Sequence, residues 1–198
     1  MSTRDQILNA IRANKPAVTT APLSPAGQLT IYDDPVAKFT ATLESIGGKV
    51  EWINKLDTVK EIVHAEQAKG LMVADLLGGH LQESGAYFAD KPADFLKDIQ
   101  LSCLQAVIGV AENGAVWIPE SAMGNRLIPF ICQHLIIILQ KDKIVSTMHQ
   151  AYEQINTFEE GFGVFLAGPS KTADIEQSLV IGAHGARSLR VFLLDQEG

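Results

Sequence analysis

Residues 50–74, VEWINKLDTVKEIVHAEQAKGLMVA, carry the pattern that decides the fold. The run Val50–Ile53 has the composition of a strand, and Leu71–Ala74 is a second short apolar run. Between them, residues 57–69 begin with a capping aspartate and place Ile62 and two valines on one helical face. This strand–helix–strand alternation predicts parallel strands in a sheet that helices cover.

The alternation continues on both sides of this stretch. Upstream, Pro35 at a first helical position and Gly47-Gly48 as a stop predict a helix. Downstream, Asn113-Gly114 between two strand-like runs predicts an antiparallel hairpin, and Leu135–Leu139 predicts a central strand. The other elements that we expect are strands at 105–112, 115–118, 164–167 and 191–194 and helices at 144–155 and 172–181, with nothing firm predicted for 78–95.

These elements predict an α/β fold, a three-layer Rossmann-like sandwich whose mostly parallel sheet contains one antiparallel hairpin. We expect an N-terminal helical arm and linker over residues 1–34 and an α/β domain over 35–198. Ser2 or Thr3 can cap the arm, which carries Ile7, Leu8 and Ile11 on one stripe. Such an arm either docks on a neighbouring subunit of a homo-oligomer or forms a disordered tail.

Composition excludes several classes of protein. Sixteen basic and 23 acidic residues give a net charge of −7, and no block of five or more lysines or arginines occurs. Nucleic acid is therefore not an expected partner, because affinity for it depends on clustered positive charge. The most apolar region, 127–139, is too short and too polar to cross a membrane, and residues 1–13 lack the apolar run of a secretory signal. We expect a cytoplasmic protein without membrane insertion.

Metal chemistry is not expected in this chain. Cys103 and Cys132 are far apart and have no Cys-x-x-Cys companion, so they cannot build a zinc site or an iron–sulfur cluster by themselves. His80 and His134 have no carboxylate or cysteine at a metal-ligand spacing. We therefore predict two buried free thiols and no metal site.

The densest polar cluster, GPSKTADIEQ at 168–177, follows a predicted strand and opens a predicted helix. Backbone N–H groups at a helix start attract anions, and the side chains there add two hydroxyls and one positive charge. A phosphate or carboxylate site is one interpretation; the other is that hydroxyls cap the helix and carboxylates complement its dipole. The residues concerned are Gly168, Ser170, Lys171, Thr172, Asp174 and Glu176.

Three further positions are candidates for chemistry. His184 lies between Gly182 and Gly185 and could exchange a proton or bind an anion, or could only bond its own turn. Glu112, at a corner of the hairpin, could act as nucleophile or base, or be a turn residue. Arg126 could clamp a carboxylate or form a surface ion pair.

Several of these residues resemble a known family. Residues 168–177 followed by Gly-Ala-His-Gly at 182–185 look like the signature of the LUD domain, or lactate-utilisation protein C (LutC/YkgG), family. Glu112-Asn113-Gly114-Ala115, Asn125-Arg126 and the Pro-x-x-x-x-His spacing at 129–134 resemble the other landmarks in the same order. The chain departs from the family pattern at Lys171, where arginine is usual, at 113–115, where Thr-Gly-Thr is usual, and at Ala186, where proline is usual.

The resemblance implies a fold of the NagB/RpiA/CoA-transferase-like type. It also implies a role in oxidising L-lactate to pyruvate with partner proteins that carry the cysteine-rich and iron–sulfur motifs, so that this chain would hold no cofactor and would bind a small anion. The alternative is a stand-alone enzyme of the same fold that acts on an acyl, sugar-phosphate or nucleotide-bearing substrate through Glu112. A third interpretation is a non-catalytic scaffold assembled through the arm.

Overall fold

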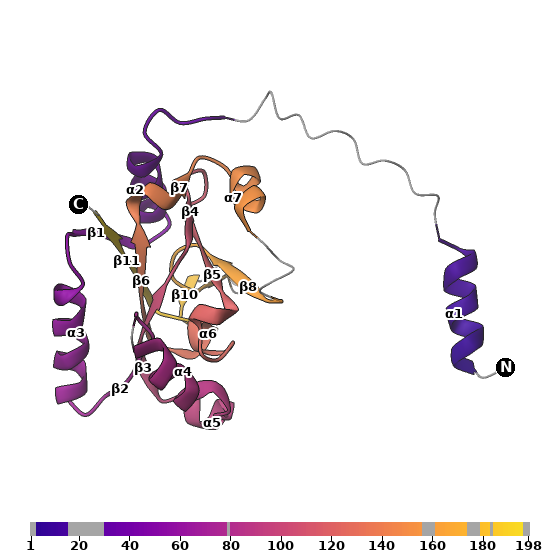
Figure 1. Cartoon of the computed structure of the whole chain (residues 1–198), viewed down its shortest axis with the longest axis horizontal. Coiled ribbons are helices and arrows are strands. Elements are labelled where there is room, and N and C mark those ends of the chain that lie inside the picture. Colours follow the sequence, from indigo (N-terminus) through magenta and orange to yellow (C-terminus); the bar gives the residue numbers. More distant parts are fainter. Residues whose placement is uncertain are drawn as a thin grey trace.

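A five-stranded parallel sheet forms the centre of the computed structural model, which describes residues 3–15, 30–78, 80–155, 161–173, 179–182 and 184–195. The strand order is β1-β11-β6-β3-β2, so the chain crosses from one edge to the other between its first two strands (Figure 1). The strands are β1 (Lys49–Ile53), β2 (Met72–Asp75), β3 (Ile99–Gln105), β6 (His134–Gln140) and β11 (Ser188–Leu194). The α/β class and the parallel sheet are thus confirmed.

The strand predicted at 135–139 is the middle strand of this sheet. β6 pairs with β11 from Ser188 opposite His134 to Leu194 opposite Gln140, and with β3 on its other side. Its five apolar residues, 135–139, are all buried. A continuous apolar run fits this place because a central parallel strand is covered on both faces.

One face of the sheet is covered by α3 (Asp57–Ala68), which lies beside it in Figure 1. Val59 and Val63 of α3 are buried against Leu101, Ile136 and other residues of the strands. The expected aspartate cap is not formed, because Leu56 occupies the capping position and its side chain makes no capping hydrogen bond. The helix is held by packing of its apolar face instead.

The opposite face carries the larger core, to which α2 and a second sheet contribute. α2 (Pro35–Ser45) begins as predicted: the Asp34 carboxylate accepts a hydrogen bond from the Ala37 N–H, and Pro35 stands at the first helical position. Phe39 and Leu43 of α2 are fully buried. Further helical segments are α4 (His80–Ala89), α5 (Ala93–Leu96), η2 (Glu120–Ala122) and α6 (Ile128–Ile131).

The predicted hairpin exists, but it belongs to the second sheet rather than to the parallel one. The order of this sheet is β7-β4-β5-β8, in which β4 and β5 are antiparallel. Gly114 closes the turn with a positive φ of 68°, and a Cβ there would lie 3.0 Å from the backbone of Leu43. Glycine therefore lets the turn lie against α2. The strands are β4 (Ile108–Val110), β5 (Ala115–Pro119), β7 (Ile144–Val145) and β8 (Gly163–Leu166).

The helix predicted over 144–155 was too long. Ile144 and Val145 form β7, which pairs with β4, after the short turn η3 (Lys141–Lys143). The helix α7 (Met148–Gln154) begins only after Thr147, whose hydroxyl and the Gln150 side chain form a reciprocal capping box. Pairing of two β-branched residues with a neighbouring strand thus ends the helical pattern at its N-terminal side.

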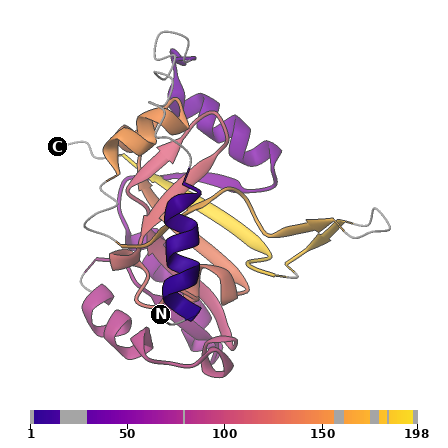
Figure 2. The same cartoon turned by 90° about the vertical axis from the view of Figure 1, so that its right-hand side faces the viewer.

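The helix predicted over 172–181 is wrong in the described residues. Lys171–Ala173 forms β9 and Leu179–Ile181 forms β10, and the two pair antiparallel. This β9–β10 hairpin extends to one side of the molecule in Figure 2. Asp174 and Glu176 lie outside the described residues.

The N-terminal arm is a helix, as predicted. α1 (Thr3–Ala13) has no buried residue, and the side chains of Ile7 and Ile11 are more than half exposed. Figure 1 shows α1 apart from the α/β body. Most of the predicted linker, residues 16–29, lies outside the described residues. Within the described part of the chain, no helix has the length and apolar character needed to cross a membrane.

Candidate functional site

Two segments that flank the β9–β10 hairpin meet at the predicted polar cluster. One follows β8 and contains Ser170; the other precedes β11 and contains Gly182 and Ala186. The Ser170 N–H donates to the Ala186 carbonyl at 2.9 Å, and the Ser170 carbonyl accepts from the Gly182 N–H at 3.0 Å. The backbone of Ser170 is therefore fixed on both sides, which fixes the place of its side chain.

Glycines allow these segments to approach their neighbours closely. Gly168 has a φ of +73°, and a Cβ there would lie 3.1 Å from the carbonyl oxygen of Ile46 at the end of α2. A Cβ at Gly185 would lie 3.1 Å from the Cβ of Ser170. The lack of a side chain at both positions permits this close approach.

The two segments border a cavity of about 290 Å³, which we call the loop cavity. Residues 165–171 and 184–186 form most of its wall, and the rest comes from Pro129, Phe130, Leu135 and Leu189. Leu135 and Leu189 stand at the starts of β6 and β11. The cavity thus lies at the amino ends of the central strands, whereas the sequence pattern predicted a site beyond a carboxyl end of the parallel sheet.

The polar groups of the loop cavity are the Ser170 hydroxyl, the Lys171 ammonium group and the His184 imidazole. Ser170 is half-buried, while Lys171 and His184 are exposed. The Lys171 side chain also passes over Gly47, where its Nζ would lie 3.5 Å from an added Cβ. That is the C-terminal end of α2, where the helix dipole favours a cation. A hydroxyl, a cation and an imidazole around one cavity can together bind a small anion.

Helix geometry does not contribute to this site. Residues 171–173 are extended, so in the described part of this segment no helix start presents N–H groups or a dipole to a ligand. Thr172 belongs to β9, with its backbone paired to Val180. Any anion binding must therefore come from side chains and from the loop backbone.

Comparison with known proteins gives the family. A profile of the family described as LUD domain matches residues 36–194. The chain belongs to the LUD domain family. It is 26% identical over 175 residues to an uncharacterized protein of Neisseria meningitidis serogroup B, covering 79% of this chain and 75% of that protein.

Other relatives carry a functional name. Lactate utilization protein C of Bacillus pumilus is 33% identical over 94 residues, which is 44% of this chain and 39% of that protein. The protein of the same name from Geobacillus thermodenitrificans is 38% identical over 84 residues, or 39% of this chain and 35% of that protein. The match thus spans only about two fifths of the length of these relatives.

A solved structure shows the same fold as this LUD domain. The crystal structure of a DUF162 family protein from Deinococcus radiodurans has a TM-score of 0.59 and 15% sequence identity. The similarity covers 87% of this chain and 99% of that one. At this identity the likeness bears on the fold alone, and it agrees with the predicted Rossmann-like sandwich.

Arg126 of the LUD domain does not line the loop cavity. Its Nε and Nη2 donate to the two carboxylate oxygens of Glu120 at 2.6 and 2.9 Å, and its guanidinium lies 4.9 Å from the centre of the Phe162 ring. The hydrogen bond from Arg126 lowers the pKa of Glu120, and the pKa of Arg126 is raised in turn. The structure therefore shows the surface ion pair that was one of the two interpretations of this arginine.

Glu112 is also absent from the wall of the loop cavity. Its carboxylate accepts a hydrogen bond of 2.7 Å from the Met148 N–H at the start of α7. Its own N–H donates to the Ser146 carbonyl. The side chain thus satisfies a backbone donor at a helix start, which is a structural role.

The two cysteines are free and buried, as predicted. They do not share a site, because Cys103 packs in the core beneath α3 and Cys132 in the core on the opposite face. Burial raises the pKa of Cys132 to about 11 and that of Cys103 further still. Thiols held protonated on two faces of a sheet are poor ligands for a cluster. Among the described residues, no group of three or more His, Cys, Asp or Glu side chains could hold a metal ion.

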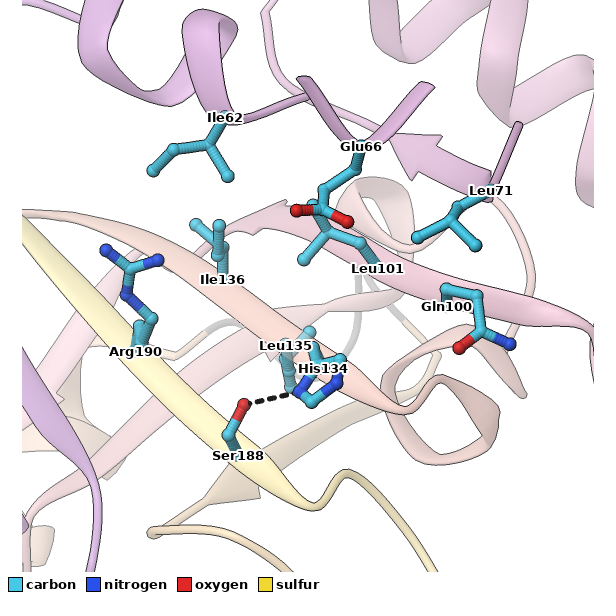
Figure 3. A pocket seen from close by; sticks show the side chains of 10 residues that line it. All are labelled: Ile62, Glu66, Leu71, Gln100, Leu101, His134, Leu135, Ile136, Ser188 and Arg190. Atoms are coloured by element: carbon cyan, nitrogen blue, oxygen red, sulfur yellow. Dashed lines mark hydrogen bonds between the residues drawn. The ribbon is translucent and has the colours of Figure 1, made fainter. Parts of the chain in front are cut away.

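Sequence reasoning missed a second group of polar residues. From its sequence spacing alone, His134 was considered as a metal ligand and rejected. In the structure His134 lines a cavity of about 240 Å³ together with Ser188, Arg190, Glu66 and Gln100 (Figure 3). These residues come from three strands and one helix, so no local motif contains them. The available signal was weak: His134 directly precedes the predicted strand at 135–139, and Ser188 lies three residues before the one predicted at 191–194.

Proposed function

We propose that this LUD-domain protein takes part in L-lactate utilisation and binds a small carboxylate in the loop cavity. The observation that carries the proposal is the pair of backbone hydrogen bonds that hold Ser170 against the segment containing His184. The names of its relatives supply the substrate class. A cavity of about 290 Å³ also suits a metabolite better than a drug-sized molecule.

The three side chains have distinct roles in this proposal. The Lys171 ammonium group attracts the carboxylate, and the Ser170 hydroxyl donates a hydrogen bond to one of its oxygens. The His184 imidazole faces the remaining hydroxyl or keto oxygen, where it holds or moves a proton. Because backbone hydrogen bonds join the segments that contain Ser170 and His184, a ligand bound between them is held in one orientation for a reaction that other proteins complete.

Oxidation of L-lactate to pyruvate removes two electrons and two protons, so an electron acceptor is required. The separately buried thiols of this chain do not suit a cluster. We therefore assign electron transfer to iron–sulfur and cysteine-rich partner proteins in the cytoplasm, and ligand binding to this chain.

Growth on lactate tests the assignment. Cells that carry Ser170→Ala with Lys171→Ala should fail to grow on L-lactate, while the purified variant keeps its circular dichroism spectrum. Lys143→Ala, at an exposed lysine in η3, is the matched control and should grow normally. Normal growth of the double variant would contradict the proposal.

Isolation of the protein under anaerobic conditions tests the partners. We expect mass spectrometry to identify iron–sulfur and cysteine-rich oxidoreductase chains with it. Recovery of the protein alone would favour a stand-alone enzyme of this fold, and turnover of acyl, sugar-phosphate or nucleotide-bearing substrates would then be measured.

The arm is the second part of the proposal. None of the eleven residues of α1 is buried, and Ile7 and Ile11 of its apolar stripe are exposed. We assign this stripe to contact with a second copy of the chain, because burying it removes apolar surface from water. Deletion of residues 1–14 should lower the mass measured by light scattering. An unchanged mass would refute this role.

A further inference from the structure

The second cavity lies between α3 and the amino ends of three strands, and we call it the scaffold cavity. Its floor is made by two rows of side chains, in which Ser188 and Leu101 flank His134 and Arg190 lies beside Ile136. Above the floor, Ile62 and Glu66 extend from α3, four residues apart and therefore on one helical face. Figure 3 shows these side chains facing one another across the cavity.

A β-bulge places Gln100 in the wall. Met72 of β2 pairs with Ile99, while the next residue, Val73, pairs with Leu101, so β3 has one extra residue at this point. Gln100 is that residue, and its amide lines the cavity. Bulges turn side chains away from the regular alternation and are frequent beside binding sites. The bulge gives the cavity an amide that a regular strand would direct to the other face.

One end of the scaffold cavity is cationic and rich in donors. Arg190 gives its Nε–H and one Nη2–H to the same oxygen of Glu51, at 3.0 and 2.7 Å. Three of the five guanidinium N–H groups are left by this pairing. Next to it, the Ser188 hydroxyl and the Nδ1 atom of His134 are hydrogen-bonded at 2.8 Å, which holds the imidazole at the floor. A carboxylate placed here meets a guanidinium, a hydroxyl and an imidazole.

The other side carries an anion. Glu66 Oε1 accepts a hydrogen bond of 2.7 Å from Lys69, and its carboxylate is directed over Leu101 in Figure 3. Ile136 lies between the Arg190 and Glu66 side chains in that view. The apolar wall consists of Ile62, Leu71, Leu101, Leu135 and Ile136. The cavity thus has a guanidinium paired with Glu51 at one end, a carboxylate paired with Lys69 on the other side, and apolar side chains between them.

We propose that the scaffold cavity binds a small zwitterion, an α-amino acid with a short apolar side chain. The carboxylate binds Arg190 and Ser188, the ammonium group binds Glu66 and the Gln100 carbonyl, and the side chain packs on Ile62 and Ile136. Donors on one side and carboxylate oxygens on the other favour a zwitterion over a simple anion, because only a zwitterion supplies both an acceptor for Arg190 and a donor for Glu66. A cavity of about 240 Å³ matches a ligand of this size.

Calorimetric titration of the full-length protein with L-leucine tests the proposal. Two leucine analogues serve as probes, 4-methylpentanoate without the ammonium group and 3-methylbutylamine without the carboxylate. Each should bind about tenfold or more weakly than leucine, since each loses one charge-assisted contact. Equal binding of leucine and 4-methylpentanoate, or no heat with leucine up to about 20 mM, would overturn the proposal.

Variants locate the site. Glu66→Gln should weaken leucine binding about tenfold and leave 4-methylpentanoate binding unchanged or stronger. Glu61→Gln, at an exposed position of the same helix, is the control and should bind leucine like the unchanged protein. Leucine binding that Glu66→Gln does not weaken would refute the site. Ser170→Ala should not change leucine binding, so this result is independent of the function proposed for the loop cavity.

Discussion

The loop cavity and the scaffold cavity lie on opposite faces of the parallel sheet, both at the amino ends of β6 and β11, yet they are built differently. Ser170 and His184 of the first come from loops that glycines and two backbone hydrogen bonds hold together. His134, Arg190 and Glu66 of the second come from regular strands and a helix. A site made by loops leaves a contiguous motif in the sequence, while a site made by the scaffold distributes single residues over distant elements.

The largest expected contrast is in the free energy of unfolding that is lost when one side chain is removed from the wall of each cavity. Ile136→Ala removes a side chain that is only 2% exposed and should lower the free energy of unfolding by about 2 to 5 kcal/mol. Phe130→Ala in the loop cavity removes a side chain that is 38% exposed and should cost about 1 kcal/mol. Urea denaturation measures both. Equal losses would show that the two walls contribute equally to stability.

Raising the pH above 9 should destabilise the folded protein, because a buried thiol lies in the core on each face of the parallel sheet. Because burial raises the pKa of Cys132 from 9.0 to about 11, the folded protein keeps a proton that the unfolded chain loses. This contribution is complete below pH 9 and is lost as pH rises to 11, a fall of roughly 2 to 3 kcal/mol. Cys132→Ala with Cys103→Ala should flatten the pH profile of the melting temperature in this range. A profile that these substitutions leave unchanged would contradict the assignment.

Alanine substitutions at two glycines should distinguish the cost of backbone strain from the cost of a steric contact. Gly182 and Gly70 have positive φ values of 80° and 77°, but a Cβ at Gly182 would lie 2.2 Å from the Arg187 side chain, whereas one at Gly70 meets nothing within 4 Å. Gly70→Ala should cost about 1 kcal/mol through backbone strain, and Gly182→Ala about 2 kcal/mol. Gly182→Ala should also weaken carboxylate binding in the loop cavity, measured by titration. Identical effects of the two substitutions would argue against a role for the contact.

The smallest effect is expected at Arg126, which lines neither cavity. Arg126→Ala should leave carboxylate binding within about twofold, because Arg126 does not line the loop cavity and its surface ion pair with Glu120 contributes little to stability. It should also return the pKa of Glu120 toward its ordinary value, which NMR titration of the carboxyl group measures. The pair stabilises the fold above the ordinary pKa of glutamate, and this contribution disappears as pH falls through the lowered value. Loss of carboxylate binding in Arg126→Ala would make it part of the site.

Four of the five strands of the parallel sheet could be predicted because their signals are local, whereas β3 (Ile99–Gln105) was missed and the strand predicted at 105–112 is the shorter β4 (Ile108–Val110). The apolar run at 135–139 and the alternation at 50–74 depend on burial, which a few neighbouring residues reveal. The turn at Asn113-Gly114 has a backbone requirement that only a few residue types meet. Its membership of a second sheet could not be predicted, since that depends on pairing with β8, some 45 residues later in the chain.

The failures come from competition between local and distant interactions. The sequence around residues 172–178 contains helix-forming residues, but the β-branched residues at 172, 180 and 181 favour a strand. Antiparallel pairing between β9 and β10 then stabilises the extended conformation over the helix. At 144–155, the Thr147-x-x-Gln150 capping box was legible in the sequence and marks the true helix start. Ser170, Lys171 and His184, which border the loop cavity, were therefore named from the sequence but given the wrong backbone, and the residues that line the scaffold cavity were missed.

Leu135 borders both cavities, so any coupling between the two proposed ligands across it obeys one thermodynamic relation. If an amino acid under α3 changes the affinity of the loop cavity for a carboxylate by some factor, the carboxylate must change the affinity for the amino acid by the same factor. Titrations in either order then describe one coupling free energy. The start of β6 would in that case link the supply of one metabolite to the use of another.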